Sequence, residues 1–255
     1  MKTLILHIGF GGLGDHLFYS HIPRIAKETG SFDKVFISNR SPFRSPDYRR
    51  LVWKANPYLD GFSDEEPTVQ TKSLSDFSKS SREYNILDSI MLCYGLDDGM
   101  RWHEPELYYT PHFIESLAGA SIYDPNYVSN VGNVRPKDVR RTVRREGFKI
   151  GFQMYARNKS IPLPDADLAR LSASSLEGFC DIIYSCERLY CLTSGTATLA
   201  AALGKPVVAF YGSGQSERFH HSKLHRYVRV RQQGPIARTK KAARDLAARL
   251  YKKIR

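Results

Sequence analysis

The sequence predicts an α/β protein built on parallel β-sheets and divided into two lobes. Strand-like and helix-like segments alternate in both halves of the chain, as in proteins whose parallel strands are joined by helices. Apolar runs such as residues 206–210 (PVVAF) are continuous, which is typical of strands buried on both faces. The 255 residues are enough for two lobes of about 120 residues each, given the usual size of domains.

The first half opens on an apolar strand at residues 3–8, followed by a glycine-rich turn and a helix expected at 17–29. A second strand is expected at 33–38 and a third at 84–88. The residues between them, 41–81, are rich in Ser, Pro and Asp and are expected to form loops. These elements make up a first lobe.

We place the linker between the lobes at residues 124–146, where Pro, Gly and Asn precede a basic run. The first lobe then covers residues 1–135, the second covers 147–237, and a C-terminal helix covers 238–255. The elements expected in the second lobe are a strand at 148–154, a helix at 176–186, a strand at 188–192, a turn and helix at 194–204 and a strand at 206–210.

The net charge of +12 predicts an anionic partner, which could be nucleic acid, a lipid surface or a phosphorylated substrate. The excess lies at 135–149 and 240–255, and the second run forms an amphipathic helix whose basic face suits an anionic membrane surface. No run reaches the roughly 18 apolar residues of a membrane span, and the N-terminus does not have the pattern of a signal peptide. The cysteine spacing does not suggest a metal site, so we expect a cytoplasmic protein with reduced thiols.

Residues 7–16 (HIGFGGLGDH) contain the pattern G-x-G-x-x-G at Gly9, Gly11 and Gly14, between a strand and a helix. Such a turn can bind a phosphate group, since backbone N–H groups and the helix dipole favour an anion. A dinucleotide site usually has an acidic residue after the second strand, whereas this chain has Arg40 there. Asp15 would repel a pyrophosphate, but Arg40 could meet a 2′-phosphate, so an NADP-dependent oxidoreductase remains an alternative.

Residues 194–212 (SGTATLAAALGKPVVAFYG) form a more specific pattern, in which small and hydroxyl residues end a strand and open a helix. This segment resembles the donor-site motif of GT-B glycosyltransferases, and in particular of the heptosyltransferase-type family, which is similar to glycosyltransferase family nine. Residues 11–25 (GGLGDHLFYSHIPRI) resemble the opening motif of the same family. Thr193 and Thr198 stand where the family motif has Asp and His, and the S-G-T-A-T form is similar to lipid A disaccharide synthases.

The resemblance implies a compact GT-B fold, in which two Rossmann-like lobes face each other across a cleft and the last helix crosses back to the first lobe. It implies inverting transfer of a sugar from a nucleotide-activated donor to a glycan or lipid-linked acceptor, in lipopolysaccharide or polysaccharide biosynthesis at the inner face of the cytoplasmic membrane. Asp15 would be the general base, and neither a metal nor another cofactor is needed. The acceptor-side loop would contain Gly11, Gly12, Gly14 and His16, and the donor would be bound by Arg157, Lys159, Ser194, Gly195, Thr196, Ala197, Thr198, Glu217 and Arg218.

Other interpretations of these residues remain open. Asp15 could cap the following helix, as could Ser194 and Thr196, and Arg157 and Lys159 could be solvated surface charges. The D-x-D pattern at 165–167 suits a helix cap better than a metal site. A non-catalytic or nucleic-acid-binding basic protein is a further alternative, but we expect no nucleic acid because aromatic residues are not interleaved with the basic runs. The sequence does not define the oligomeric state.

Overall fold

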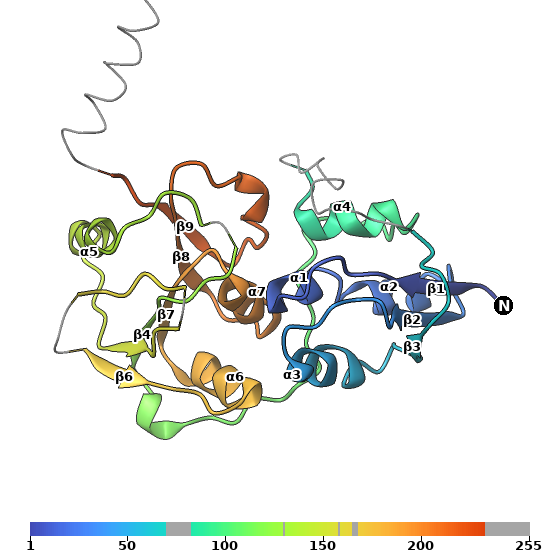
Figure 1. Cartoon of the computed structure of the whole chain (residues 1–255), viewed down its shortest axis with the longest axis horizontal. Coiled ribbons are helices and arrows are strands. Elements are labelled where there is room, and N and C mark those ends of the chain that lie inside the picture. The colour runs from blue at the N-terminus through green and yellow to red at the C-terminus, as the bar shows by residue number, and fades with distance from the viewer. Residues whose placement is uncertain (70–82, 130, 158, 165–167, 233–255) are drawn as a thin grey trace, which may run out of the picture.

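Two lobes lie side by side in the computed structural model of the chain, each with its own parallel sheet (Figure 1). The structure describes residues 1–69, 83–129, 131–157, 159–164 and 168–232. The α/β class predicted from the sequence is confirmed. The expected helix at 238–255 and the D-x-D pattern at 165–167 lie outside the described residues.

The first lobe contains a three-stranded sheet with the order β1-β2-β3. Its strands are β1 (Thr3–Leu6), β2 (Lys34–Ser38) and β3 (Gly61–Ser63). β1 therefore lies at one edge, where Ile5 exchanges hydrogen bonds with Thr68 rather than with another named strand of the described residues. The helices are α1 (Leu13–Leu17), α2 (Ile22–Glu28), α3 (Pro46–Tyr48), a π-helical η1 (Arg49–Lys54) and α4 (Ile86–Cys93).

Three expectations for the first lobe were wrong. The stretch 41–81, which was expected to form loops, contains α3, η1 and β3. The strand expected at 84–88 is the start of α4, since Asn85 accepts the Asp88 N–H at 3.0 Å and Asp88 accepts the Asn85 N–H at 2.9 Å. This reciprocal cap starts a helix, so the apolar residues that follow are helical and not extended. The helix expected at 17–29 is divided into α1 and α2, and Pro23 suits the first turn of α2, where its missing N–H has no intrahelical partner.

The second lobe contains a six-stranded sheet with the order β6-β5-β4-β7-β8-β9 and parallel pairing throughout. Counted from β4, this is the Rossmann order 3-2-1-4-5-6. Its strands are β4 (Ser121–Asp124), β5 (Phe152–Met154), β6 (Ala169–Leu171), β7 (Arg188–Leu192), β8 (Val207–Tyr211) and β9 (Arg226–Arg229). The helices are α5 (Pro136–Arg145), α6 (Leu176–Ser185) and α7 (Gly195–Ala202), with short 3₁₀ turns η3 (Glu115–Leu117) and η4 (Glu217–Phe219).

β4 and α5 correct the sequence analysis at the lobe boundary. β4 lies within residues 1–135, which were assigned to the first lobe, yet it pairs with β5 and β7 of the second sheet. The expected linker at 124–146 contains α5, whose Val139 and Val143 are buried while Arg141, Arg144 and Arg145 are exposed. The strand expected at 148–154 is the shorter β5, and it is the second strand of this sheet rather than the first.

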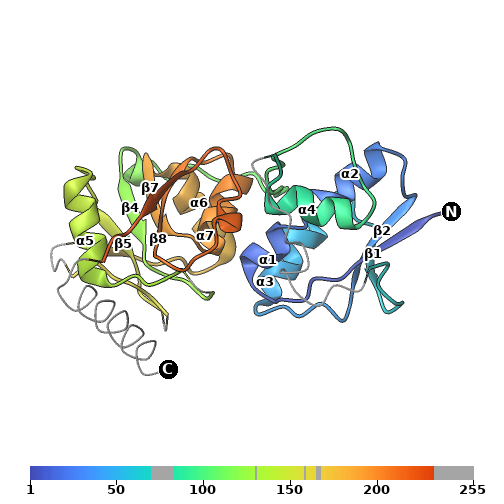
Figure 2. The ribbon, with the colours of Figure 1, turned by 90° about the horizontal axis from the view of Figure 1, so that it is seen from above.

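The large sheet has apolar layers on both faces. One layer joins Ile122 and Leu189 to α6 and α7 and continues into the first lobe as a single core, whereas the other joins Tyr123 and Tyr190 to α5. The lobes meet where α1 packs against α7, as both views show (Figures 1 and 2). Within the described residues, no helix is long and apolar enough to cross a membrane.

Candidate active site

The strand order of the second lobe indicates where a ligand binds. The order reverses between β4 and β7, and ligands of open α/β sheets bind outside the carboxyl ends of the strands at such a point. Asp124 ends β4, and Thr193 and Ser194 follow β7. We therefore take this edge of the sheet as the candidate site.

Asp124 is a buried carboxylate at the centre of this edge. Its Oδ2 accepts the Thr196 hydroxyl at 2.5 Å, and its Oδ1 accepts the Asn126 N–H at 3.1 Å and the Asn126 side-chain amide at 2.7 Å. Burial raises the pKa of Asp124, although these hydrogen bonds and the charge of Arg157 act in the opposite direction. Sequence reasoning missed Asp124, and the signal was an acidic residue directly after the apolar segment Ser121–Tyr123.

The predicted donor turn lies at the same edge, but only part of it is accessible. Ser194 caps α7, because its hydroxyl accepts the Thr196 N–H at 3.4 Å. Ser194 and Gly195 are partly exposed, whereas Thr196, Ala197 and Thr198 are buried. The turn therefore offers a ligand Ser194 and Gly195, and the other three residues support it from below.

The two turns singled out in the sequence analysis contact each other. A Cβ atom at Gly14 would lie 3.2 Å from the Gly195 Cα, and one at Gly195 would lie 3.2 Å from the Gly14 nitrogen. Gly11 is equally confined, since a Cβ there would lie 3.0 Å from the Pro42 carbonyl oxygen. Gly14 and Gly195 thus allow α1 to approach α7 closely, whereas Gly11 lets the first turn pack on the segment that carries Pro42.

Asp15 lies at this contact, one residue after Gly14. Its Oδ2 accepts the Gly12 N–H at 3.0 Å, so Asp15 does cap its own helix. A Cβ at Gly12 would lie 2.6 Å from that oxygen, so a side chain there would displace the Asp15 carboxylate. Burial raises the pKa of Asp15, opposed by the Gly12 N–H and by the charge of Arg44. A carboxylate with a raised pKa beside a ligand site is suited to accept a proton.

His16 lies in the interior of the first lobe. Its Nδ1 accepts the Trp53 indole N–H at 3.0 Å, so its Nε2 donates to the Pro42 carbonyl at 3.0 Å, and the ring stacks on Phe43. Burial lowers the pKa of His16 to about 4, which keeps the ring neutral. With no exposed surface, His16 supports the turn and does not face an acceptor.

Arg157 and Lys159 follow β5, the second strand of the lobe, and not its first strand as the sequence analysis assumed. Both side chains are exposed. The charge of Arg157 acts on Asp124 in the second lobe and on Tyr48 in the first, so Arg157 lies between the lobes. The Lys159 ammonium donates to the Val128 carbonyl at 3.4 Å.

The loop after β8 closes the other side of the edge. The Thr193 hydroxyl donates to Gln215 Oε1 at 2.6 Å, and a Cβ at Gly132 would lie 2.5 Å from the Gly212 carbonyl oxygen. The loops that follow β4, β7 and β8 are therefore packed on one another. Glu217 is exposed, and the Arg218 guanidinium lies over the Phe219 ring at 4.9 Å. No contact of the described residues ties either of them to Asp124 or Asp15.

Comparison with solved structures identifies the fold. No protein-family model and no curated protein matches the sequence. The iron-containing dodecameric heptosyltransferase TibC of enterotoxigenic E. coli H10407 matches with a TM-score of 0.59 and 13% identity over 88% of this chain. Heptosyltransferase II of E. coli matches with a TM-score of 0.57 and 13% identity, over 91% of this chain and 92% of its own. A family 9 glycosyltransferase from Veillonella parvula DSM 2008 matches with a TM-score of 0.56 and 9% identity, over 96% of this chain and 89% of its own.

These matches place the chain in the GT-B fold class. The resemblance stated from the sequence is thereby confirmed at the level of the fold. The chain spans about 61% of the length of TibC. TibC is described as containing iron, but the described residues of this chain hold no group of three or more His, Cys, Asp or Glu side chains suited to a metal.

Proposed function

We propose that the protein is an inverting glycosyltransferase that uses a nucleotide-activated sugar, with Asp15 as general base. The observation that carries the proposal is the contact between the turn that bears Asp15 and the turn at the Rossmann switch point. Since TibC binds ADP-D-β-D-heptose and WaaC binds ADP, we take an ADP-activated heptose as the donor to test first.

In this reaction an acceptor hydroxyl oxygen attacks the anomeric carbon of the donor from the side opposite the diphosphate. The new bond joins that oxygen to the anomeric carbon, and the bond from the anomeric carbon to the phosphate oxygen breaks. Asp15 takes the hydroxyl proton, and the nucleoside diphosphate leaves with the electron pair of the broken bond. The partly buried position of Asp15 supports this role because burial raises its pKa toward the working pH.

The leaving diphosphate needs hydrogen-bond donors and positive charge. Ser194 and Gly195 at the start of α7 supply hydroxyl and backbone donors, and Arg157 supplies charge between the lobes. Lys159, Glu217 and Arg218 stay predicted donor contacts. The scheme needs no metal, which also stays a prediction.

We further propose a glycan or glycolipid acceptor of lipopolysaccharide or polysaccharide biosynthesis, at the inner face of the cytoplasmic membrane. The basic runs at 135–149 and 240–255 suit an anionic surface there. The run at 135–149 includes α5, whose exposed residues include Arg141, Arg144 and Arg145.

The test uses ADP-heptose and a panel of lipid A-core acceptors, with ADP release as the readout. Asp15→Asn should lower kcat by about 10²–10⁴-fold, the usual contribution of a general base, and leave ADP binding unchanged. Asp47→Asn is the matched control, because Asp47 lies in the same lobe and its side chain forms an exposed ion pair with Arg50. Full activity of Asp15→Asn would refute the assignment of the base.

The oxidoreductase alternative is disfavoured by the sheet of the first lobe. Its order β1-β2-β3 has no reversal among the described strands, and Gly14 of the glycine-rich turn packs on α7. Thermal shifts with ADP and NADPH on wild type and Ser194→Trp separate the two functions. Stabilisation by NADPH that survives Ser194→Trp would overturn the glycosyltransferase proposal.

A further inference from the structure

The side chain of Asn126 joins three segments of the candidate site. Its amide group donates to Asp124 Oδ1 at 2.7 Å and to the Tyr155 carbonyl at 3.0 Å, and its Oδ1 accepts the Arg157 N–H at 2.7 Å. Asp124 in turn accepts the Thr196 hydroxyl of α7. Through Asp124, Asn126 therefore connects the end of β4, the loop after β5 and the first turn of α7.

Backbone hydrogen bonds extend this connection along the chain. The Tyr127 N–H donates to the Lys159 carbonyl at 3.1 Å, and the Ile161 N–H donates to the Pro125 carbonyl at 2.9 Å. These two bonds fix the segment that carries Arg157 on its C-terminal side, and on its N-terminal side the Tyr155 N–H donates to the Leu171 carbonyl at 2.7 Å. Between these bonds, the Asn126 side chain supplies the contacts to Tyr155 and Arg157.

We propose that Asn126 is a positioning residue that orients Arg157 toward the leaving diphosphate of the donor. This inference rests on the proposed function. Arg157 is exposed, and among the described residues its guanidinium makes no hydrogen bond to another side chain, so its donors are available to an anion. A flexible arginine loses entropy when it binds an anion, and an anchored backbone reduces that loss.

The chemistry of the site calls for an amide at position 126. The group that faces Asp124 and the Tyr155 carbonyl must donate, and the group that faces the Arg157 N–H must accept. Asparagine meets both requirements. Aspartate would set a second carboxylate oxygen against Asp124, which disfavours the charged form of both groups.

The experiment is a double-mutant cycle on ADP binding, measured by calorimetry on the full chain. Arg157→Ala should weaken ADP binding by about tenfold or more, as expected for lost hydrogen bonds to a charged group. Asn126→Ala should weaken it by a similar factor, and the double variant should be no weaker than Arg157→Ala alone, because both changes remove one interaction. Asn126→Asp, which is closest in size, serves as the second variant and should also weaken binding.

Asn56→Ala is the matched control. Asn56 is a buried asparagine of the first lobe whose side chain also joins two backbone segments. It donates to the Ser20 carbonyl at 3.2 Å and accepts the Tyr58 N–H at 2.9 Å. Asn56→Ala should lower the melting temperature without changing ADP affinity. In turnover, Asn126→Ala should raise the KM for the donor and leave the KM for the acceptor unchanged, a separation that general destabilisation would not produce.

The outcomes separate this inference from the proposed function. If wild type binds ADP and the Asn126 variants bind it equally well, or if the two changes are additive, the positioning role is refuted and the function stands. If neither ADP nor any other nucleoside diphosphate binds wild type, the proposed function fails and the inference fails with it.

Discussion

The units β1–α1 and β7–α7 have the same local plan, a strand, a small-residue turn and a helix, but different surroundings. β7 lies inside a six-stranded sheet at the point where the strand order reverses, whereas β1 lies at the edge of a three-stranded sheet. The same kind of turn is therefore a candidate ligand site in one lobe, and in the other a surface that contacts it. The neighbouring strands, and not the glycine pattern itself, decide which role a turn has.

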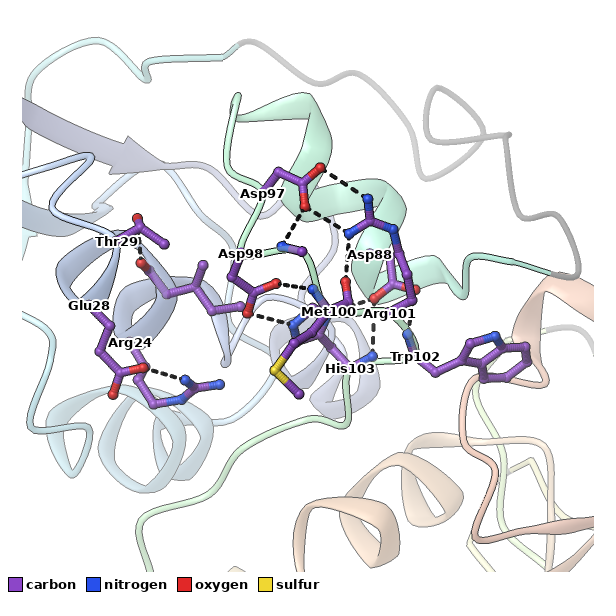
Figure 3. A network of polar contacts seen from close by, with 12 residues as sticks. Arg24, Glu28, Thr29, Asp88, Asp97, Asp98, Met100, Arg101, Trp102 and His103 are labelled. Carbon is purple, nitrogen blue, oxygen red and sulfur yellow. Dashed lines mark hydrogen bonds and ion pairs between the residues drawn. The ribbon is translucent and has the colours of Figure 1, made fainter.

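The two lobes also differ in what lies in their interiors. The second lobe has apolar layers on both faces of its sheet, whereas the first lobe buries a polar network beside α4. In that network Asp88 accepts the backbone N–H groups of Asn85, Trp102 and His103, and the His103 ring at 2.6 Å (Figure 3). These bonds fix the segment 97–103, including Trp102 at its positive φ of 62°. Hydrogen bonds of buried side chains thus stabilise this lobe, whose sheet has few strands.

The largest expected effect on stability follows from this difference. Asp88→Ala leaves His103 and three backbone N–H groups without their acceptor, so we expect a loss of about 3–5 kcal/mol in unfolding free energy, as for a broken buried ion pair. Urea unfolding measures it. Asp124→Asn is the comparison in the second lobe. It should leave stability at pH 7 unchanged or raised, because it removes a buried charge, its oxygen still accepts from Asn126, and its NH2 group can donate to the Thr196 hydroxyl. Equal losses in both variants would contradict the contrast between the lobes.

The contact between the two turns gives the next effect. Gly14→Val forces side-chain atoms against Gly195 and the Thr198 hydroxyl, so we expect a loss of about 1–3 kcal/mol, as for an overpacked core. The melting temperature and ADP affinity should both fall, since the turn of α7 must shift. Gly178→Ala in α6 is the control: its Cβ would lie an ordinary 3.5 Å from Ser175 Oγ, and helix propensity predicts a gain of about 0.5–1 kcal/mol. If Gly14→Val left the melting temperature and the ADP affinity unchanged, the lobes would have to separate freely at this contact.

The sequence predicted the parallel α/β class and the turn that opens a helix at 194–198, because both depend on local patterns, whereas the role of Asp15 stays a prediction. Sequence reasoning failed where the signal was spatial. β4 has only four residues, and only its pairing between β5 and β7 identifies it as the first strand of the large sheet. Asp124 follows a short apolar segment, but its role and that of Asn126 depend on partners between 29 and 72 residues away, which are Thr196, Tyr155 and Arg157. Likewise, no rule on sequence alone would pair Gly14 with Gly195.

The two buried carboxylates should also respond to pH in opposite directions. Asp88 has a pKa below its usual 3.8, so it contributes stability above that value and loses it as the pH falls through the lowered pKa. Asp124 has a raised pKa, so its contribution is present below 3.8 and is lost as the pH rises through the raised pKa. Between pH 4 and 7, the stability of wild type relative to Asp124→Asn should therefore fall as the pH rises. Over the same range, the stability of wild type relative to Asp88→Asn should stay constant. Parallel curves for the two variants would show that the carboxylates have the same environment.

The smallest effect is expected at the ion pair between the lobes. Arg50 of η1 contacts Glu177 of α6 at 2.9 Å, but the Arg50 side chain is 53% exposed, and such pairs contribute about 0.2–1 kcal/mol. Glu177→Ala should thus lower stability by no more than this, and the loss should vanish in 1 M salt, where charges are screened within about 3 Å. The reason is that the lobes already share an apolar core and the Gly14–Gly195 contact, which do not depend on charge. A loss that exceeds that of Gly14→Val would instead mean that charges at the rim hold the lobes together, and that the close approach of the two turns is a consequence of the interface and not its cause.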